Sequence, residues 1–162
     1  MRYLLKQKLF AWGDDFHIRN EKDEKVFFVD GRAFSLGNKL SFQDLSGKEL
    51  VFIRQKLLSI GRTYELHRDG NLAAMVKKKH FTFFHCKFSI DVPGPDDLEA
   101  KGDFLDREYA FIRGRREIAQ VSKRWFALSD TYGVEIAEGE DDVLLLASAV
   151  VIDMICHDEE KH

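Results

Sequence analysis

The sequence is poor in cysteine and proline. Its two cysteines, Cys86 and Cys156, lie far apart, one in a phenylalanine-rich run and one in an apolar run near the C-terminus. Two core-like thiols favour a reducing compartment over a disulfide-stapled domain, although a bond between them is left open. Without such a framework a hydrophobic core must hold the fold, and 44% hydrophobic residues with 14 phenylalanines supply one. We expect residues 1–162 to form a single domain.

An excess of positive charge is also missing. The chain carries 25 Lys and Arg against 28 Asp and Glu, a formal net charge of −3, so no global basic field attracts nucleic acid. Residues 1–10 contain neither a long apolar run nor a small-residue cleavage site, which argues against a signal peptide. We therefore expect a cytoplasmic protein, with a peripheral position at a membrane left open.

The common catalytic motifs are absent from the sequence. It contains no GxSxG elbow, no phosphate-binding P-loop and no GxGxxG turn, and no nucleophile–base pair can be recognised. His80, His85 and Cys86 lie close together, but no second cluster supplies the further ligands that a zinc site needs. His85 and Cys86 would also point to opposite faces of a strand. We expect no enzyme activity, no cofactor and no metal.

An apolar run near the C-terminus is the clearest element. Asp141 and Asp142 are suited to cap a helix that continues to Cys156. Within it only Ser148 and Asp153 are polar, and the apolar residues surround the helix instead of forming one stripe. Such a helix must be buried on all sides, yet it is shorter than the roughly 20 residues that span a bilayer. We expect Ser148 to bond to its own helix and Asp153 to find a partner or reach water near one end of the surrounding structure.

Acidic residues crowd the start of this helix. A cation site would explain them, but a solvated turn with helix capping is the simpler interpretation. The residues concerned are Glu135, Glu138, Glu140, Asp141 and Asp142.

Short runs rich in aromatic and β-branched residues fill the rest of the chain. Turn sequences separate them about every 8–12 residues, as in all-β proteins. Asp30–Gly31 predicts a two-residue hairpin, and Phe104–Ile112 predicts a single strand. Asp130–Gly133 predicts a break in the strand-like run Trp125–Ile136. We count about twelve candidate strands without crossover helices. A closed sheet of this size has no free edges, and its interior is too wide for side chains alone to fill. We predict an all-β fold, a closed antiparallel barrel of about twelve strands around the hydrophobic C-terminal helix.

Two stretches of the chain resemble each other. Residues 64–81 align without gaps on residues 109–126. The similarity reflects either a true internal repeat or two hairpins that meet similar structural constraints. The alignment matches Lys78 and Lys79 with Lys123 and Arg124. We therefore predict that the basic clusters converge in one patch that binds phosphates or an anionic leaflet; the alternative is an ordinary solvated face. The residues of this expected patch are Lys77, Lys78, Lys79, Arg113, Arg115, Arg116, Lys123 and Arg124.

Several passages together resemble the LURP-one-related family in order and spacing. They are Phe34–Ser41, Asp44–Glu49, Gln55–Ser59, Val76–Lys79, Phe81–Phe84, Gly102–Phe104, Trp125–Phe126, Asp130–Tyr132 and the closing apolar helix. The resemblance covers almost the whole chain and is closest to the short bacterial members. It implies the tubby C-terminal-like fold, a twelve-stranded barrel around a hydrophobic C-terminal helix, and no established activity. Proteins of related fold include the tubby domain, which binds phosphoinositide headgroups, and the phospholipid scramblases; their functions extend to this chain by analogy of fold alone.

Two classes of function fit these observations. The first is a non-enzymatic binding module for anionic phospholipid headgroups or another phosphorylated ligand, which a contiguous basic patch would favour. The second is a structural or protein-interaction domain with no small-molecule ligand, which an exposed apolar patch of several hundred Å² would favour.

Overall fold

Twelve strands and one helix make up the fold. The computed structural model describes residues 1–6, 15–31, 39–57, 62–82, 85–125 and 131–160, and of residues 6, 80–82, 85–86 and 157–160 it describes the backbone only. The strands are β1 (Arg2–Lys6), β2 (Phe16–Asn20), β3 (Lys25–Asp30), β4 (Lys39–Asp44), β5 (Glu49–Gln55), β6 (Thr63–Arg68), β7 (Asn71–Thr82), β8 (His85–Asp91), β9 (Leu98–Asp103), β10 (Glu108–Arg113), β11 (Arg116–Ser122) and β12 (Thr131–Ile136), and the helix is α1 (Asp142–Glu160).

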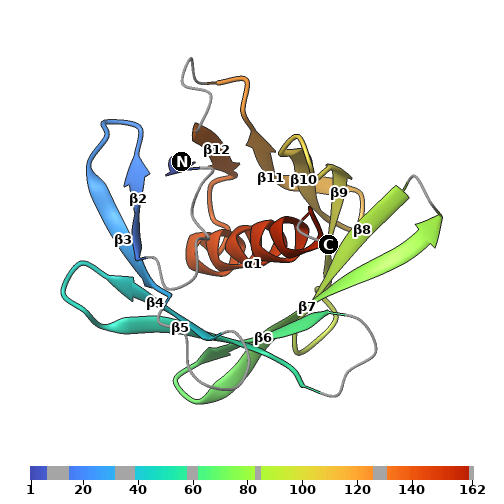
Figure 1. Ribbon diagram of the computed structural model, residues 1–162, viewed down its shortest axis with the longest axis horizontal. Coiled ribbons are helices and arrows are strands. Elements are labelled where there is room, and N and C mark those ends of the chain that lie inside the picture. Colours follow the sequence, from blue (N-terminus) through green and yellow to red (C-terminus); the bar gives the residue numbers. More distant parts are fainter. Residues whose placement is uncertain (7–14, 32–38, 58–61, 83–84, 126–130, 161–162) are drawn as a thin grey trace.

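The strands form a closed antiparallel barrel. Each strand pairs with its neighbours in chain order, and β1 pairs with β12 to close the sheet. The helix α1 runs through the middle, with strands around it on all sides (Figure 1). Because neighbours are antiparallel, all odd-numbered strands begin at one end of the barrel, which we call the N-end, where α1 also begins; α1 ends at the other, the C-end. This arrangement confirms the predicted architecture.

The interior of the barrel is filled by the helix. Residues 145–152 of α1 are at most 1% exposed, so every side of this segment is covered. The surrounding strands alternate, and their inward residues include Phe42, Tyr64, Phe88 and Phe111, all fully buried. Burial of apolar surface is the main favourable term in folding, and here the helix and the strands bury each other.

One strand, β9, was not expected from the sequence. Its residues, LEAKGD, have low β-propensity, and the neighbouring Phe104–Ile112 was predicted as one strand. In the structure a turn after β9 carries Phe104, and β10 begins at Glu108. Gly102 has φ +143° and lies so close to β10 that a Cβ atom there would be 2.6 Å from the Cα of Tyr109. Pairing with β8 and β10 therefore imposes the strand on a sequence with little preference for it.

Two boundary predictions were also wrong. The Asp30–Gly31 sequence does not form a two-residue hairpin, because β3 ends at Asp30 and β4 begins only at Lys39. The predicted break at Asp130–Gly133 is wrong for residues 131–133, which begin β12, where Gly133 pairs with Leu4 on one side and Ser122 on the other. Asp130 lies outside the described residues. Two flanking strands outweigh the weak local preference of a glycine.

Candidate anion-binding surface

Two arginines anchor the segment that leads into the helix. Arg68 ends β6 and Arg113 ends β10, and the two are equivalent positions of the sequence repeat. The guanidinium of Arg68 donates to both carboxylate oxygens of Asp141 at 2.8 and 3.0 Å, and that of Arg113 donates to Glu140 at 2.9 and 3.0 Å. Arg113, one of the residues of the expected patch, is therefore held by a carboxylate at the N-end.

Asp141 and Asp142, at the start of the helix, have partners within the protein. Asp141 accepts a bond from the backbone N–H of Leu144 at 3.1 Å, as a helix cap does. Burial raises the pKa of Asp141, but the hydrogen bonds from Arg68 and Leu144 and the charge of Arg68 outweigh it, so the pKa lies below its ordinary 3.8. Asp142 accepts a bond from the Tyr3 hydroxyl, whose pKa is raised by burial and by that bond. These contacts favour the capping interpretation over a cation site.

A pocket of about 890 Å³ opens at the N-end of the barrel. It is lined by Met1, by residues 20–22 and by residues 137–143. Among the described residues no group of three or more His, Cys, Asp or Glu is placed to hold a metal ion. The side chains of His80, His85 and Cys86 lie outside the described part of the chain.

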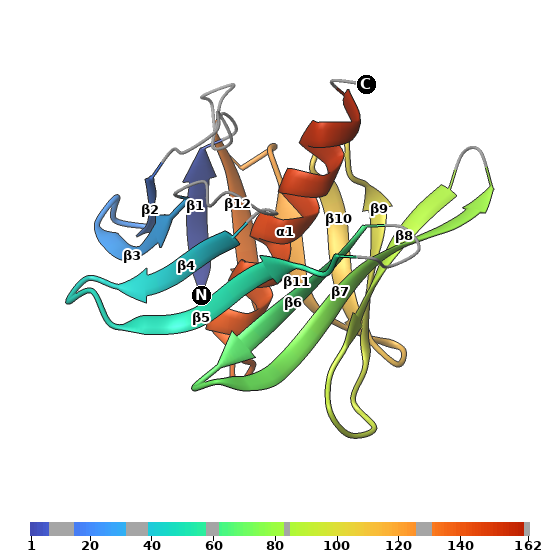
Figure 2. The ribbon, with the colours of Figure 1, turned by 60° about the horizontal axis from the view of Figure 1, so that its bottom comes forward.

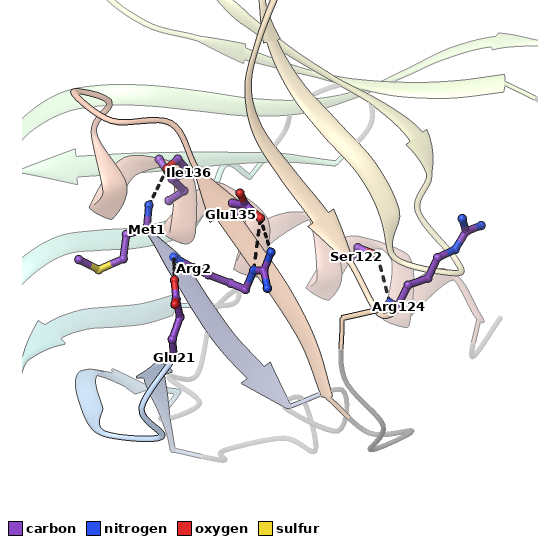
Figure 3. Close-up of polar contacts among 7 residues, drawn as sticks. All are labelled: Met1, Arg2, Glu21, Ser122, Arg124, Glu135 and Ile136. Atoms are coloured by element: carbon purple, nitrogen blue, oxygen red, sulfur yellow. Dashed lines mark hydrogen bonds and ion pairs between the residues drawn. The ribbon is translucent and has the colours of Figure 1, made fainter.

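The eight basic residues of the expected patch do not come together. Lys77–Lys79 lie on β7, whereas Arg113, Arg115 and Arg116 surround the β10–β11 turn at the N-end. Lys123 and Arg124 follow the last residue of β11 at the C-end. Because a strand rises about 3.3 Å per residue, the seven residues of β11 put roughly 20 Å between the two groups. Figure 3 shows Arg124 beyond the end of β11, where its backbone N–H bonds to the Ser122 hydroxyl at 3.1 Å.

The sequence repeat explains why one patch was expected. The β6–β7 and β10–β11 hairpins are equivalent, and each has a register shift at the matching place, after Leu66 and after Phe111. Lys79 and Arg124 accordingly lie at the same end of the barrel. However, β8, β9 and β10 separate β7 from β11, a distance of roughly 19 Å along the sheet at about 4.8 Å per step. Equivalent strands of the two hairpins are not neighbours, so equivalent charges stay apart.

A different set of lysines does lie side by side. Lys79 on β7 pairs with Lys87 on β8, and Lys87 pairs with Lys101 on β9, so the three form a row across adjacent strands. Lys77 lies two positions before Lys79 on the same side of β7. The alternate residues Val76, Phe88 and Ala100 are buried in the core, so the lysines point outward. We call this surface the lysine face; it consists of Lys77, Lys79, Lys87 and Lys101.

Two carboxylates belong to this surface. Glu99 contacts Lys87 at 3.2 Å and Lys101 at 3.1 Å, and Asp91 contacts Lys77 at 3.3 Å. Hydrogen bonds from Lys101 and Lys87 lower the pKa of Glu99, which keeps it ionised at neutral pH. In the ion pairs of the described residues, the four lysines of this surface share two carboxylates, so the lysine face is more positive than the chain as a whole, whose net charge is −3.

The sequence could not reveal this row. Lys87 stands alone between phenylalanines, and Lys101 lies on β9, the strand that was not predicted. Only the register of β7, β8 and β9 brings the lysines together. These lysines could have been identified as neighbours only if β9 had been predicted as a strand.

Both polar residues inside the helix are hydrogen-bonded within the protein. The Ser148 hydroxyl donates to the carbonyl oxygen of Leu144 in its own helix at 2.8 Å. Asp153, 5% exposed, accepts a bond from Nε of Arg107 at 2.8 Å and one from the Tyr132 hydroxyl at 3.4 Å. This group lies near the C-end and includes no unpaired charge, so it supports the fold and needs no ligand.

Comparison with known proteins assigns the family. The family model described as LURP-one-related matches residues 1–153. The chain belongs to the LURP-one-related family. A Bacillus subtilis (strain 168) relative, described as the uncharacterized protein YxjI, is 38% identical over 156 residues, which cover 96% of this chain and 94% of the relative. The Arabidopsis thaliana protein LURP-one-related 6 is 25% identical over 158 residues and covers 88% of this chain and 82% of its own length.

A solved structure shares the fold of this LURP-one-related chain. The X-ray structure of an Arabidopsis thaliana protein superposes with a TM-score of 0.68 at 18% identity, covering 96% of this chain and 91% of the other. No helix among the described residues is long and apolar enough to cross a membrane.

Proposed function

We propose that this LURP-one-related domain is a non-enzymatic binding module for phosphate-bearing anionic ligands, phospholipid headgroups among them. The observation that supports it is the lysine face on β7, β8 and β9. Lysines placed directly opposite each other repel and destabilise a sheet. A row of three is therefore a cost to folding, which a binding role would explain.

The chemistry of the lysine face suits such ligands. An ammonium group on a flexible four-carbon stem is a mobile point charge with three donors, and it contacts phosphate oxygens from many directions. The ion pairs with Asp91 and Glu99 are partly exposed, and pairs of this kind contribute only about 0–1 kcal/mol. A multivalent anion can therefore replace these carboxylates at small cost.

The alternative, a structural or protein-interaction domain without a small-molecule ligand, has less support. It would need a continuous exposed apolar patch. The exposed large apolar residues of the described chain come from five separate segments: Met1, Leu45, Leu57, Leu72 and Leu105. Single exposed apolar residues are normal on a protein surface.

Two binding experiments at low salt test the proposal. Vesicles of phosphatidylcholine alone and of phosphatidylcholine with phosphatidylserine are sedimented with the protein, and inositol hexakisphosphate is titrated in a calorimeter. We expect association with at least one of the two anionic partners, none with neutral vesicles, and weakening by added salt, because exposed charges are screened over about 8–10 Å at physiological ionic strength. Absence of binding to both anionic partners would contradict the proposal.

A further inference from the structure

We infer that the lysine face binds a flat anionic membrane surface and responds to its charge density, not to one headgroup; this rests on the proposed function. The first argument is the position of the lysines on the outside of a closed barrel. The outer surface of a barrel is convex, so a ligand there is contacted from one side only. A site that selects one headgroup instead surrounds it with convergent polar groups.

The second argument is the type and spacing of the charges. Lys79, Lys87 and Lys101 lie on consecutive strands about 4.8 Å apart, so the row spans roughly 10 Å. All four cations of the lysine face are lysines, which lack the planar fork with which arginine binds one phosphate in two places. Separate point charges on flexible stems suit several lipid headgroups at once.

The third argument is access. The β7–β8 hairpin, which carries Lys77, Lys79 and Lys87, extends outward from the barrel on the right of both views (Figures 1 and 2). A planar surface can therefore reach this hairpin without first meeting the rest of the barrel.

The fourth argument is the distribution of opposite charge. The acidic residues Glu138, Glu140, Asp141 and Asp142 line the pocket at the N-end. The row Lys79–Lys87–Lys101 lies in the half of the barrel toward the C-end, where β7 and β9 end and β8 begins. Arg68 and Arg113 pair with Asp141 and Glu140, and Arg115 and Arg116 lie at the same end, so the N-end carries mixed charge. An anionic leaflet therefore attracts the row more strongly than it attracts the N-end, and the protein should dock with the row toward the membrane and the pocket directed away from it.

The test compares two variants of equal net charge. The first, Lys79→Gln/Lys87→Gln/Lys101→Gln, removes the row. The matched control, Arg115→Gln/Arg116→Gln/Arg124→Gln, removes three exposed charges that belong to the expected patch but lie elsewhere. Sedimentation is measured with phosphatidylserine vesicles and with vesicles that carry phosphatidylinositol 4,5-bisphosphate at the same total surface charge. Circular dichroism confirms that both variants fold.

We expect wild-type protein to bind the two charge-matched vesicles equally. The lysine variant should bind both about a hundredfold more weakly, since each lysine near a charged surface contributes roughly a fivefold factor. The control variant should bind within a few-fold of wild type, because Arg115 and Arg116 lie at the N-end and Arg124 follows β11, which is two strands away from β9 and four from β7.

The possible failures are distinguishable. Strong preference for the phosphoinositide, binding of inositol hexakisphosphate without vesicles, or binding of an RNA oligonucleotide in place of vesicles would overturn the membrane inference. Loss of binding in the control but not in the lysine variant would overturn the assignment of the face. In these cases an anion still binds; failure of wild-type protein to bind any anionic partner would overturn the proposed function itself.

Discussion

Arg107 is the residue whose role is hardest to find in the sequence. It lies in the turn between β9 and β10 with φ +53°, in the left-handed region that non-glycine residues rarely adopt. This conformation accompanies a side chain that lies in the barrel and bonds to Asp153 of α1. Burial raises the pKa values of Tyr109 and Tyr132, so both hydroxyls stay neutral and Arg107 and Asp153 form the charged pair. The sequence predicted that Asp153 needs a partner; it did not predict which one, because the turn was taken for a strand.

The buried pair gives a prediction at the scale of single residues. Arg107→Ala should lower the free energy of unfolding by about 3–5 kcal/mol, because it leaves the Asp153 carboxylate buried and unpaired. The double variant Arg107→Met/Asp153→Leu should lose less, since no charge remains in the core. Urea denaturation of wild type and the two variants measures this. A single variant within 1 kcal/mol of wild type, on the order of an exposed pair, would show that the pair is not buried in solution.

At the scale of elements, the sequence predicted correctly the element that a local residue pattern determines. It failed for the element that is determined by pairing with neighbouring strands. Acidic capping residues and an apolar surface on every side identify the helix in the sequence. The strand β9 has no such signature, since Leu98 and Ala100 face the core but the other positions are charged residues and a glycine. The lysine face was therefore not predicted either, because it forms only through the register of β9 with its neighbouring strand.

The start of α1 gives a prediction with a defined pH dependence. Asp141→Asn keeps a capping oxygen and loses the charge that pairs with Arg68, whereas Asp141→Ala loses both. We expect Asp141→Ala to cost about 1–2 kcal/mol and Asp141→Asn less than about 1 kcal/mol in the free energy of unfolding at neutral pH.

The pKa of Asp141 is lower in the folded protein than its ordinary 3.8, so the unfolded chain binds the proton more tightly. The stabilisation from its charge is thus complete above pH 3.8 and is lost as pH falls through the lower folded pKa. Urea denaturation across this range should show the gap between wild type and Asp141→Asn closing on acidification. A gap that stays constant or widens toward low pH would contradict this.

At the scale of the whole molecule, the barrel and its helix stabilise each other. A closed sheet of twelve strands has no free edge, and the helix occupies the interior that the strands alone would leave open. The charge pattern at this scale was mispredicted for a geometric reason. The repeat places equivalent residues at the same end of the barrel, but in a meander the equivalent strands lie four positions apart.

The mutual support of helix and barrel predicts the effect of a charge in the interior. Leu145 is 1% exposed in the first turn of α1, and Leu145→Asp should unfold the protein, because an unpaired buried charge costs several kcal/mol. Leu45→Asp is the matched control, since Leu45 is 59% exposed in a turn and should tolerate the same change. Thermal melts followed by circular dichroism separate the two. An unchanged melting temperature for Leu145→Asp would mean that the helix is not enclosed.

Paramagnetic broadening measures directly which surface meets a membrane. Amide signals of the isotope-labelled protein are recorded with phosphatidylserine nanodiscs that contain a spin-labelled lipid, and with the same discs after reduction of the label. We predict that broadening centres on Lys77–Lys79, Lys87 and Lys101, while residues 137–143 at the opposite end of the barrel keep their intensity. Broadening centred on Arg113–Arg116 or on residues 137–143 would contradict the assignment of the lysine face, and discs that broaden no signal would contradict membrane binding altogether.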